Sequence, residues 1–245
     1  MAGYDLVDSL LELWHKVFDA QDVPPRAVIL VAGAVALVAV LIRPLWRVAR
    51  SFITIAHEGG HALAAVLTGR RLSGIRLHSD TSGLTLSRGR PTGFGMVITG
   101  LAGYITPPLL GMGAAALLAI GRITLLLWLT VILLAAMLIM IRNVFGVVSV
   151  VVTIAIVLGV SWYAGADVQS AFAYTFAWFL LLGGGRAVFE LQQSRYRRQA
   201  PASDADQVGR LTHVPAILWV GFFAAIALVA LAVSAQWLVN VSVTR

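Results

Sequence analysis

The chain has 245 residues, of which 59% are hydrophobic and only 12% are charged, and it contains no cysteine. Soluble domains carry about 25% charged residues, so this composition excludes an ordinary soluble domain and indicates an integral membrane protein. The lack of cysteine excludes disulfides and thiolate metal sites, and the net charge of +7 does not indicate nucleic-acid binding, because the arginine clusters flank apolar runs as in cytoplasmic membrane loops.

The first 25 residues predict an amphipathic N-terminal segment. Its apolar residues recur at helical spacing, at Leu6, Leu10, Leu13, Trp14, Val17 and Phe18. Acidic residues dominate this stretch, whereas a secretory signal peptide begins with basic residues, so no cleavable signal peptide is expected.

Apolar runs of about 20 residues predict membrane helices. The predicted spans are 27–42, 94–120, 123–141, 144–163, 168–182 and 215–239, with a further apolar helix at 51–68. Three glycines at 183–185 are expected to end the fifth span, and a polar loop, 186–213, follows. The sequence therefore predicts an all-α polytopic membrane protein with about six or seven membrane helices.

Residues 72–90 differ from everything around them, because apolar and polar residues alternate on either side of Asp80-Thr81-Ser82-Gly83. This pattern predicts a β-hairpin directly after the helix at 51–68. Two interpretations stay open: a surface hairpin without function, or a sheet edge that holds an unfolded substrate segment by strand addition.

The most specific pattern is His57-Glu58-Gly59-Gly60-His61, inside the apolar run 53–67. Residues four apart lie on one face of a helix, so both imidazoles can bind the same metal ion. Glu58 lies about 100° around the helix from His57 and can take a proton from a water molecule beside the metal. Ionisable groups in a membrane are costly unless they are paired or metal-bound. This HExxH pattern predicts one zinc ion and proteolysis within the membrane.

Arginine clusters lie on both sides of this motif helix, at 43–50 and at 70–90. A helix that crossed the membrane fully would place one cluster outside, against the tendency of basic residues to remain in the cytoplasm. We therefore expect a motif helix that does not fully cross. Four predicted spans separate the hairpin from the loop 186–213, so both lie on one side, and their arginines indicate the cytoplasmic side.

A catalytic zinc site needs three protein ligands, and without cysteine the third must come from a small set of residues. Asp167 lies on the opposite side, Asp80 fits a turn, and Glu190 lies among arginines. Asp204 and Asp206, just before the last span, remain. Position alone does not choose between these two, nor between a ligand and a helix N-cap.

The chain resembles the site-2 protease superfamily of intramembrane zinc metallopeptidases, and within it the bacterial and plant peptidase 50B-like branch. The resemblance extends from about residue 52 to the last span. It rests on the HExxH motif, the Thr68-Gly69 helix end, Gly83-Leu84-Thr85 with Arg88-Gly89, Arg142-Asn143, and Ser203-Asp204-Ala205-Asp206.

This resemblance implies a protease that cuts membrane-spanning protein substrates in the bilayer. His57 and His61 would bind zinc and Glu58 would activate water; Asp204 would be the third ligand, with Asp206 as the alternative. Asn143 is a candidate for stabilising the oxyanion or positioning the substrate. Better-studied members take their third ligand from an Asp-Gly pair, which this chain lacks. Residues 26–245 would form a single metalloprotease domain.

The composition also indicates where the protein is located. We expect a multi-pass protein of the plasma membrane, and the strong preference for Arg over Lys suggests a bacterium with a GC-rich genome. Two other functions stay open: an inactive, protease-like scaffold, and a metal or proton transporter. An intact Glu58 argues against the scaffold, and spans nearly free of charge argue against the transporter.

Overall fold

The computed structural model describes residues 11, 14–15, 17–199 and 202–240. About half of the predicted amphipathic segment, residues 1–25, therefore lies outside the described residues. Its described end packs on the rest of the chain, because the side-chain oxygen of Gln21 accepts a hydrogen bond of 2.9 Å from the N–H of Thr124.

Helices α2 (Arg26–Leu41) and α3 (Arg43–Leu67) meet at a bend of 102°. Pro44 lies in the first turn of α3, where a missing N–H costs no helical hydrogen bond. The motif helix therefore begins at Arg43, eight residues before the start at Ser51 that the sequence predicts. Pro44, which follows the predicted span 27–42, thus lies at the start of the next helix.

Strands β1 (Arg71–Leu77) and β2 (Gly83–Arg88) form the predicted antiparallel hairpin. Residues 141–143 cover the outer edge of β1: Ile141 forms a parallel bridge with Ile75, whose carbonyl accepts a 2.9 Å hydrogen bond from the N–H of Arg142. No strand in the described part of the chain pairs with the other edge of β2.

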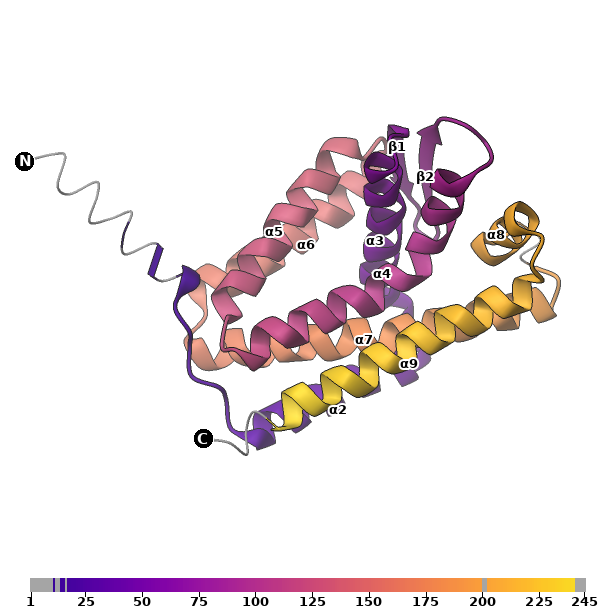
Figure 1. The fold of residues 1–245 in the computed structure, drawn as a ribbon. Helices are drawn as coiled ribbons and strands as arrows, with labels where there is room; N and C mark the ends of the chain where they lie inside the picture. The colour runs from indigo at the N-terminus through magenta and orange to yellow at the C-terminus, as the bar shows by residue number, and fades with distance from the viewer. Residues whose placement is uncertain (1–10, 12–13, 16, 200–201, 241–245) are drawn as a thin grey trace, which may run out of the picture.

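Three apolar helices follow the hairpin: α4 (Phe94–Ala119), α5 (Ile123–Met140) and α6 (Val144–Tyr163). Pro107 and Pro108 remove hydrogen bonds in the middle of α4, and Figure 1 shows its two halves running in different directions. The first half packs on α3. The second half follows helix α7 (Ala166–Tyr196).

Helix α7 passes through Gly183, Gly184 and Gly185, so the prediction that these glycines end it was wrong. A Cβ on Gly183 would lie 2.8 Å from Ile53 of α3, and one on Gly184 would lie 2.8 Å from Pro108 of α4. The glycines therefore allow two helices to approach α7 closely, and this packing outweighs their low helix propensity.

The region 186–213, predicted to be a polar loop, is mostly helical. It contains the last turns of α7 and a short helix, α8 (Asp204–Thr212). The chain then enters α9 (Ala216–Asn240).

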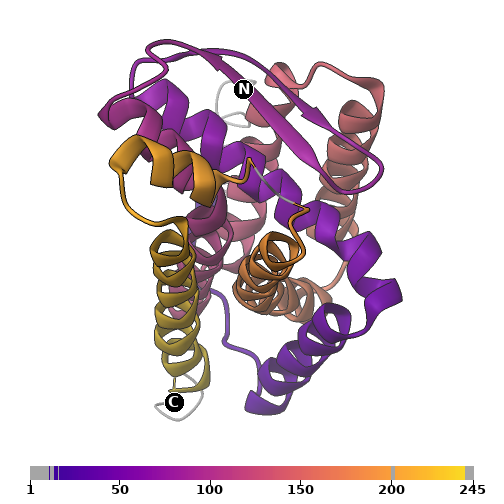
Figure 2. The ribbon, with the colours of Figure 1, turned by 90° about the vertical axis from the view of Figure 1, so that its right-hand side faces the viewer.

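Helix α3 runs across the bundle that α2, α7 and α9 form, rather than along it (Figures 1 and 2). The hairpin packs beside α3. A buried apolar cluster joins α3, the hairpin, α5 and α6, and it includes Ile55, Ile75, Leu134 and Val150. The expectation that the motif helix does not fully cross the membrane stays a prediction.

Among the described residues, five helices, α4, α5, α6, α7 and α9, are each long and apolar enough to cross a membrane, and this part of the chain has up to six spans if α2 and α3 together count as one. The sequence predicted about six or seven. The predicted fold class, a helical multi-pass membrane protein with a small hairpin after the motif helix, is confirmed.

Candidate metal centre

His57 and His61 lie one turn apart on α3, and their Nε2 atoms are 3.0 Å from each other. Asp204, the first residue of α8, brings its Oδ2 atom to 3.2 Å from each of these nitrogens. The side chains of His57, His61 and Asp204 keep 18%, 11% and 21% of their surface exposed, respectively. A small molecule can therefore still reach the cluster.

The spacing of these three atoms matches that of ligands around one metal ion. Tetrahedral ligands at about 2.0 Å from zinc are about 3.3 Å from one another, close to the 3.0–3.2 Å seen here. All three atoms come from side chains that bind zinc in proteins. The residues present therefore fit a metal ion.

The orientation of His61 supports the same conclusion. Its Nδ1 atom lies 2.7 Å from the carbonyl oxygen of Thr99 in α4, and because a carbonyl only accepts, Nδ1 carries the hydrogen. In the neutral imidazole, Nε2 then presents a lone pair to the carboxylate of Asp204. A histidine that binds a metal usually donates its other ring N–H to a carbonyl or carboxylate in this way, which fixes the orientation of the ring.

Aromatic rings and a glycine complete the walls around the two imidazoles. The ring of His57 meets that of Tyr104 edge-on at 4.7 Å between centroids, and Tyr104 stacks on Phe223 of α9. A Cβ on Gly103 would lie 2.5 Å from Cε1 of His57 and would also overlap His61. Only a glycine at this position leaves room for both rings.

Glu58 is 4% exposed and contacts strand β2. Thr85 donates its hydroxyl hydrogen at 2.6 Å to Oε2 of Glu58, and the same hydroxyl lies 3.1 Å from the Glu58 main-chain oxygen. A Cβ on Gly83 would lie 2.5 Å from the Glu58 side chain. The hairpin therefore holds the carboxylate in place.

Asp206, the alternative third ligand, is engaged elsewhere. Its carboxylate accepts hydrogen bonds from Arg195 of α7 and, at 2.5 Å, from Ser203, the N-cap of α8. Burial alone would raise the pKa of Asp206, but the Ser203 and Arg195 hydrogen bonds hold the pKa below its ordinary value. Asp206 thus fixes the start of α8, while Asp204 reaches the imidazoles.

The carboxyl of Asp204 is held in the form that binds metals. Burial alone would raise its pKa, but the neighbouring imidazoles, chiefly that of His61, lower the pKa below its ordinary value. The group is therefore ionised at neutral pH.

Asn143 lies outside the cluster of His57, His61 and Asp204. Its side-chain oxygen accepts a hydrogen bond of 3.2 Å from the N–H of Leu77, and its amide donates one of 2.6 Å to the Leu77 carbonyl. The side chain thus extends the pairing of residues 141–143 with β1.

Sequence reasoning gave no role to Thr85 or Thr99. The signals for Thr85 were its position in the alternating hairpin and its place in the Gly83-Leu84-Thr85 element of the family resemblance. A main-chain carbonyl such as that of Thr99 cannot be recognised in a sequence.

The comparisons with known proteins give one match. The family model described as Peptidase M50B-like matches residues 30–234, a range that contains the motif, the hairpin and α8. Comparisons with curated proteins and with solved structures gave no significant match. Since the family model covers most of the chain and all of its candidate metal ligands, the protein belongs to the Peptidase M50B-like family, within the site-2 protease superfamily.

Proposed function

We propose that this protein is an intramembrane zinc metalloprotease that hydrolyses peptide bonds of membrane-spanning proteins. The observation that carries the proposal is the meeting of His57, His61 and Asp204 at 3.0–3.2 Å beside Glu58, in an apolar protein. Membership of a peptidase family supports it.

One zinc ion would be held by two imidazole nitrogens and one carboxylate oxygen. Three protein ligands leave a position for water or substrate, as in catalytic rather than structural zinc sites. Bound zinc supplies Lewis acidity, which acidifies water and polarises a carbonyl group.

Glu58 is the proposed general base and then general acid. Its carboxylate takes a proton from the attacking water and returns it to the leaving amine. Thr85 fixes one carboxylate oxygen, Oε2, by its 2.6 Å hydrogen bond. This contact restricts the rotamers of Glu58, so that the base is oriented before the substrate arrives.

The free edge of β2 is the proposed substrate site. A peptide bond in a membrane helix is shielded by its own hydrogen bonds, so the helix must unwind before hydrolysis. An unwound segment paired with β2 would replace those lost hydrogen bonds and would lie beside Glu58, because Gly83 and Thr85 of the same strand contact that side chain. Asn143 would act indirectly, by holding β1 against residues 141–143.

We further propose that the protein lies in a bacterial plasma membrane with its active site toward the cytoplasm. The arginines of the hairpin and of the region 186–213 support this orientation.

The test combines zinc content with proteolysis. We expect about one zinc per chain by elemental mass spectrometry, lost in His57→Ala and Asp204→Ala and kept in Asp206→Asn, which retains an oxygen acceptor for Arg195 and Ser203. Glu58→Gln should keep zinc and cleave fluorescently labelled casein, a generic unfolded substrate, at least about 100-fold more slowly.

Two outcomes would contradict the proposal in different ways. If the native protein is folded but contains no zinc, it is not a zinc metalloprotease. If the protein binds zinc but the native chain and Glu58→Gln cleave casein at the same rate, the protein is a metal-binding scaffold and not a protease.

A further inference from the structure

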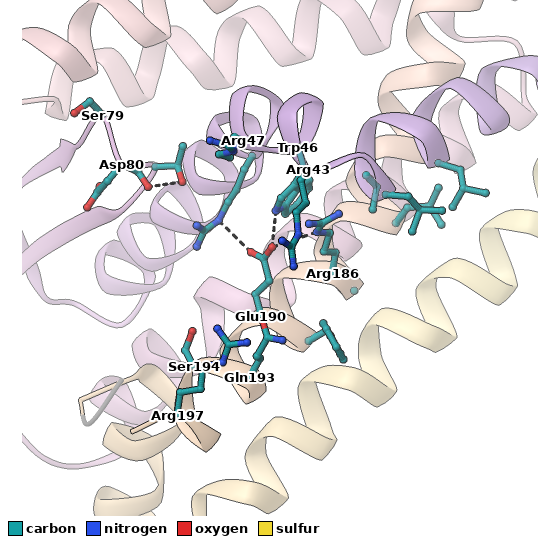
Figure 3. A pocket seen from close by; sticks show the side chains of 18 residues that line it. Arg43, Trp46, Arg47, Ser79, Asp80, Arg186, Glu190, Gln193, Ser194 and Arg197 are labelled. Atoms are coloured by element: carbon teal, nitrogen blue, oxygen red, sulfur yellow. Dashed lines mark hydrogen bonds and ion pairs between the residues drawn. The ribbon is translucent and has the colours of Figure 1, made fainter. Parts of the chain in front are cut away.

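A second feature of the molecule lies outside the metal centre. An open pocket of about 1090 Å³ is formed where α2 meets α3, between the turn of the hairpin and the second half of α7 (Figure 3). None of its lining residues belongs to the cluster of His57, His61 and Asp204. The proposed protease activity gives this pocket no role.

The pocket is strongly basic. Five arginines line it against two carboxylates, which leaves a net charge of +3. Glu190 accepts hydrogen bonds from Trp46 at 2.6 Å and Arg186 at 3.2 Å, and it lies 3.4 Å from Nε of Arg50. One carboxylate thus serves two arginines and cannot neutralise both.

The side chains of the other three arginines are exposed and can contact a ligand. The guanidinium groups of Arg43, Arg47 and Arg197 have no hydrogen-bond or ion-pair partner among the described residues. Arg43 and Arg47 also lie in the first turns of α3, where the helix dipole adds positive potential. In Figure 3, Arg43, Trp46 and Arg47 come from α3, and they lie opposite the row of Arg186, Glu190, Gln193 and Arg197 on α7.

The remaining wall of the pocket is apolar. Leu37 and Leu41, at the end of α2, are 42% and 65% exposed, and Phe189 of α7 is 67% exposed. The bend between α2 and α3 therefore places an apolar surface directly beside unpaired arginines. A ligand that fits both parts carries a negative head and a hydrocarbon tail.

We propose that this pocket binds the headgroup of an anionic phospholipid, with the phosphate among Arg43, Arg47 and Arg197 and an acyl chain along Leu37 and Leu41. Arginine recognises phosphate oxygens through its planar array of donors. Basic pockets between membrane helices are suited to anionic headgroups. The bend thereby becomes a lipid-binding junction at the edge of the membrane.

The test uses the full chain, purified in an uncharged detergent, and native mass spectrometry. Dioctanoyl-phosphatidylglycerol should bind at least about tenfold more tightly than dioctanoyl-phosphatidylcholine. The triple variant R43Q/R47Q/R197Q should lose about fivefold in affinity per arginine. The matched variant R71Q/R76Q/R88Q removes the same charge from exposed positions on the hairpin and should change the affinity less than about twofold.

Inorganic phosphate separates a lipid site from a free phosphate site. We expect phosphate to compete only weakly, and Leu37→Ala/Leu41→Ala to weaken lipid binding without affecting phosphate. Equal binding of both lipids, equal losses in the two triple variants, or phosphate binding as tight as lipid would each overturn the proposal. Unchanged size-exclusion profiles and melting temperatures of the variants show that they fold, independently of any metal or activity.

Discussion

Gly103 of α4 lies against both imidazoles of the metal centre. We predict that Gly103→Ala displaces His57 and His61 and lowers zinc affinity by at least about tenfold, because the new methyl group overlaps both rings. Gly113→Ala is the matched control, since it lies on the same helix with no atom within 4 Å of the added Cβ. Zinc content by elemental mass spectrometry checks both variants, and a Gly103→Ala protein that holds zinc as well as Gly113→Ala would contradict this reading.

The sequence could define the motif residues but not the third ligand. His57, Glu58 and His61 follow from spacing on one helix, because the helix itself sets their relative positions. Asp204 and Asp206 are two residues apart and therefore lie about 200° apart around α8, so only one can face α3. Which one does so depends on how α8 docks: Val208 packs against Gly100, and Arg195 binds Asp206. The spacing of residues in the sequence does not reveal how α8 docks.

Among the elements, strand β2 has the most direct link to the proposed chemistry. We predict that Thr85→Val lowers the cleavage rate about tenfold while zinc content stays unchanged, because valine keeps the shape of threonine but leaves Oε2 of Glu58 without its donor. Thr85→Ser keeps the hydroxyl and should retain most activity. Rates with labelled casein check this, and equal rates for the valine and serine variants would show that the hydrogen bond has no influence on Glu58.

The elements themselves were largely predictable, since long apolar runs and a polar alternating stretch have few alternatives in a membrane protein. The hairpin and α4, α5, α6 and α9 begin and end within about two residues of their predicted limits. The errors arose where proline and glycine were interpreted only locally. Pro44 lies in the first turn of α3, and Gly183 and Gly184 lie inside α7 because α3 and α4 press against them.

At the scale of the whole molecule, no feature of the sequence indicated the basic pocket. Its arginines come from two stretches, 43–50 and 186–197, that meet only because α3 turns by 102° from α2 and crosses α7. From the sequence, these arginines were expected to lie beside or between the membrane helices and to indicate the orientation of the protein in the membrane. The fold places them instead on helix faces around one cavity.

The metal centre also joins parts of the chain that are far apart, because the two histidines come from α3 and Asp204 from α8. A bound ion would therefore act as a cross-link that keeps α8 docked. The exposed Arg197 and Arg198, in the connection between α7 and α8, are cleavage sites for trypsin. We predict that a chelator speeds cleavage there about tenfold, because removing a ligand of the folded state raises the population of locally open forms.

Peptide mapping after brief digestion checks this prediction, and Asp204→Ala should be cleaved equally fast with and without chelator. If the chelator also leaves the native chain unchanged, α8 docks without the ion. Otherwise, susceptibility to trypsin becomes a direct reporter of metal occupancy that works in crude membrane fragments, before any substrate is known.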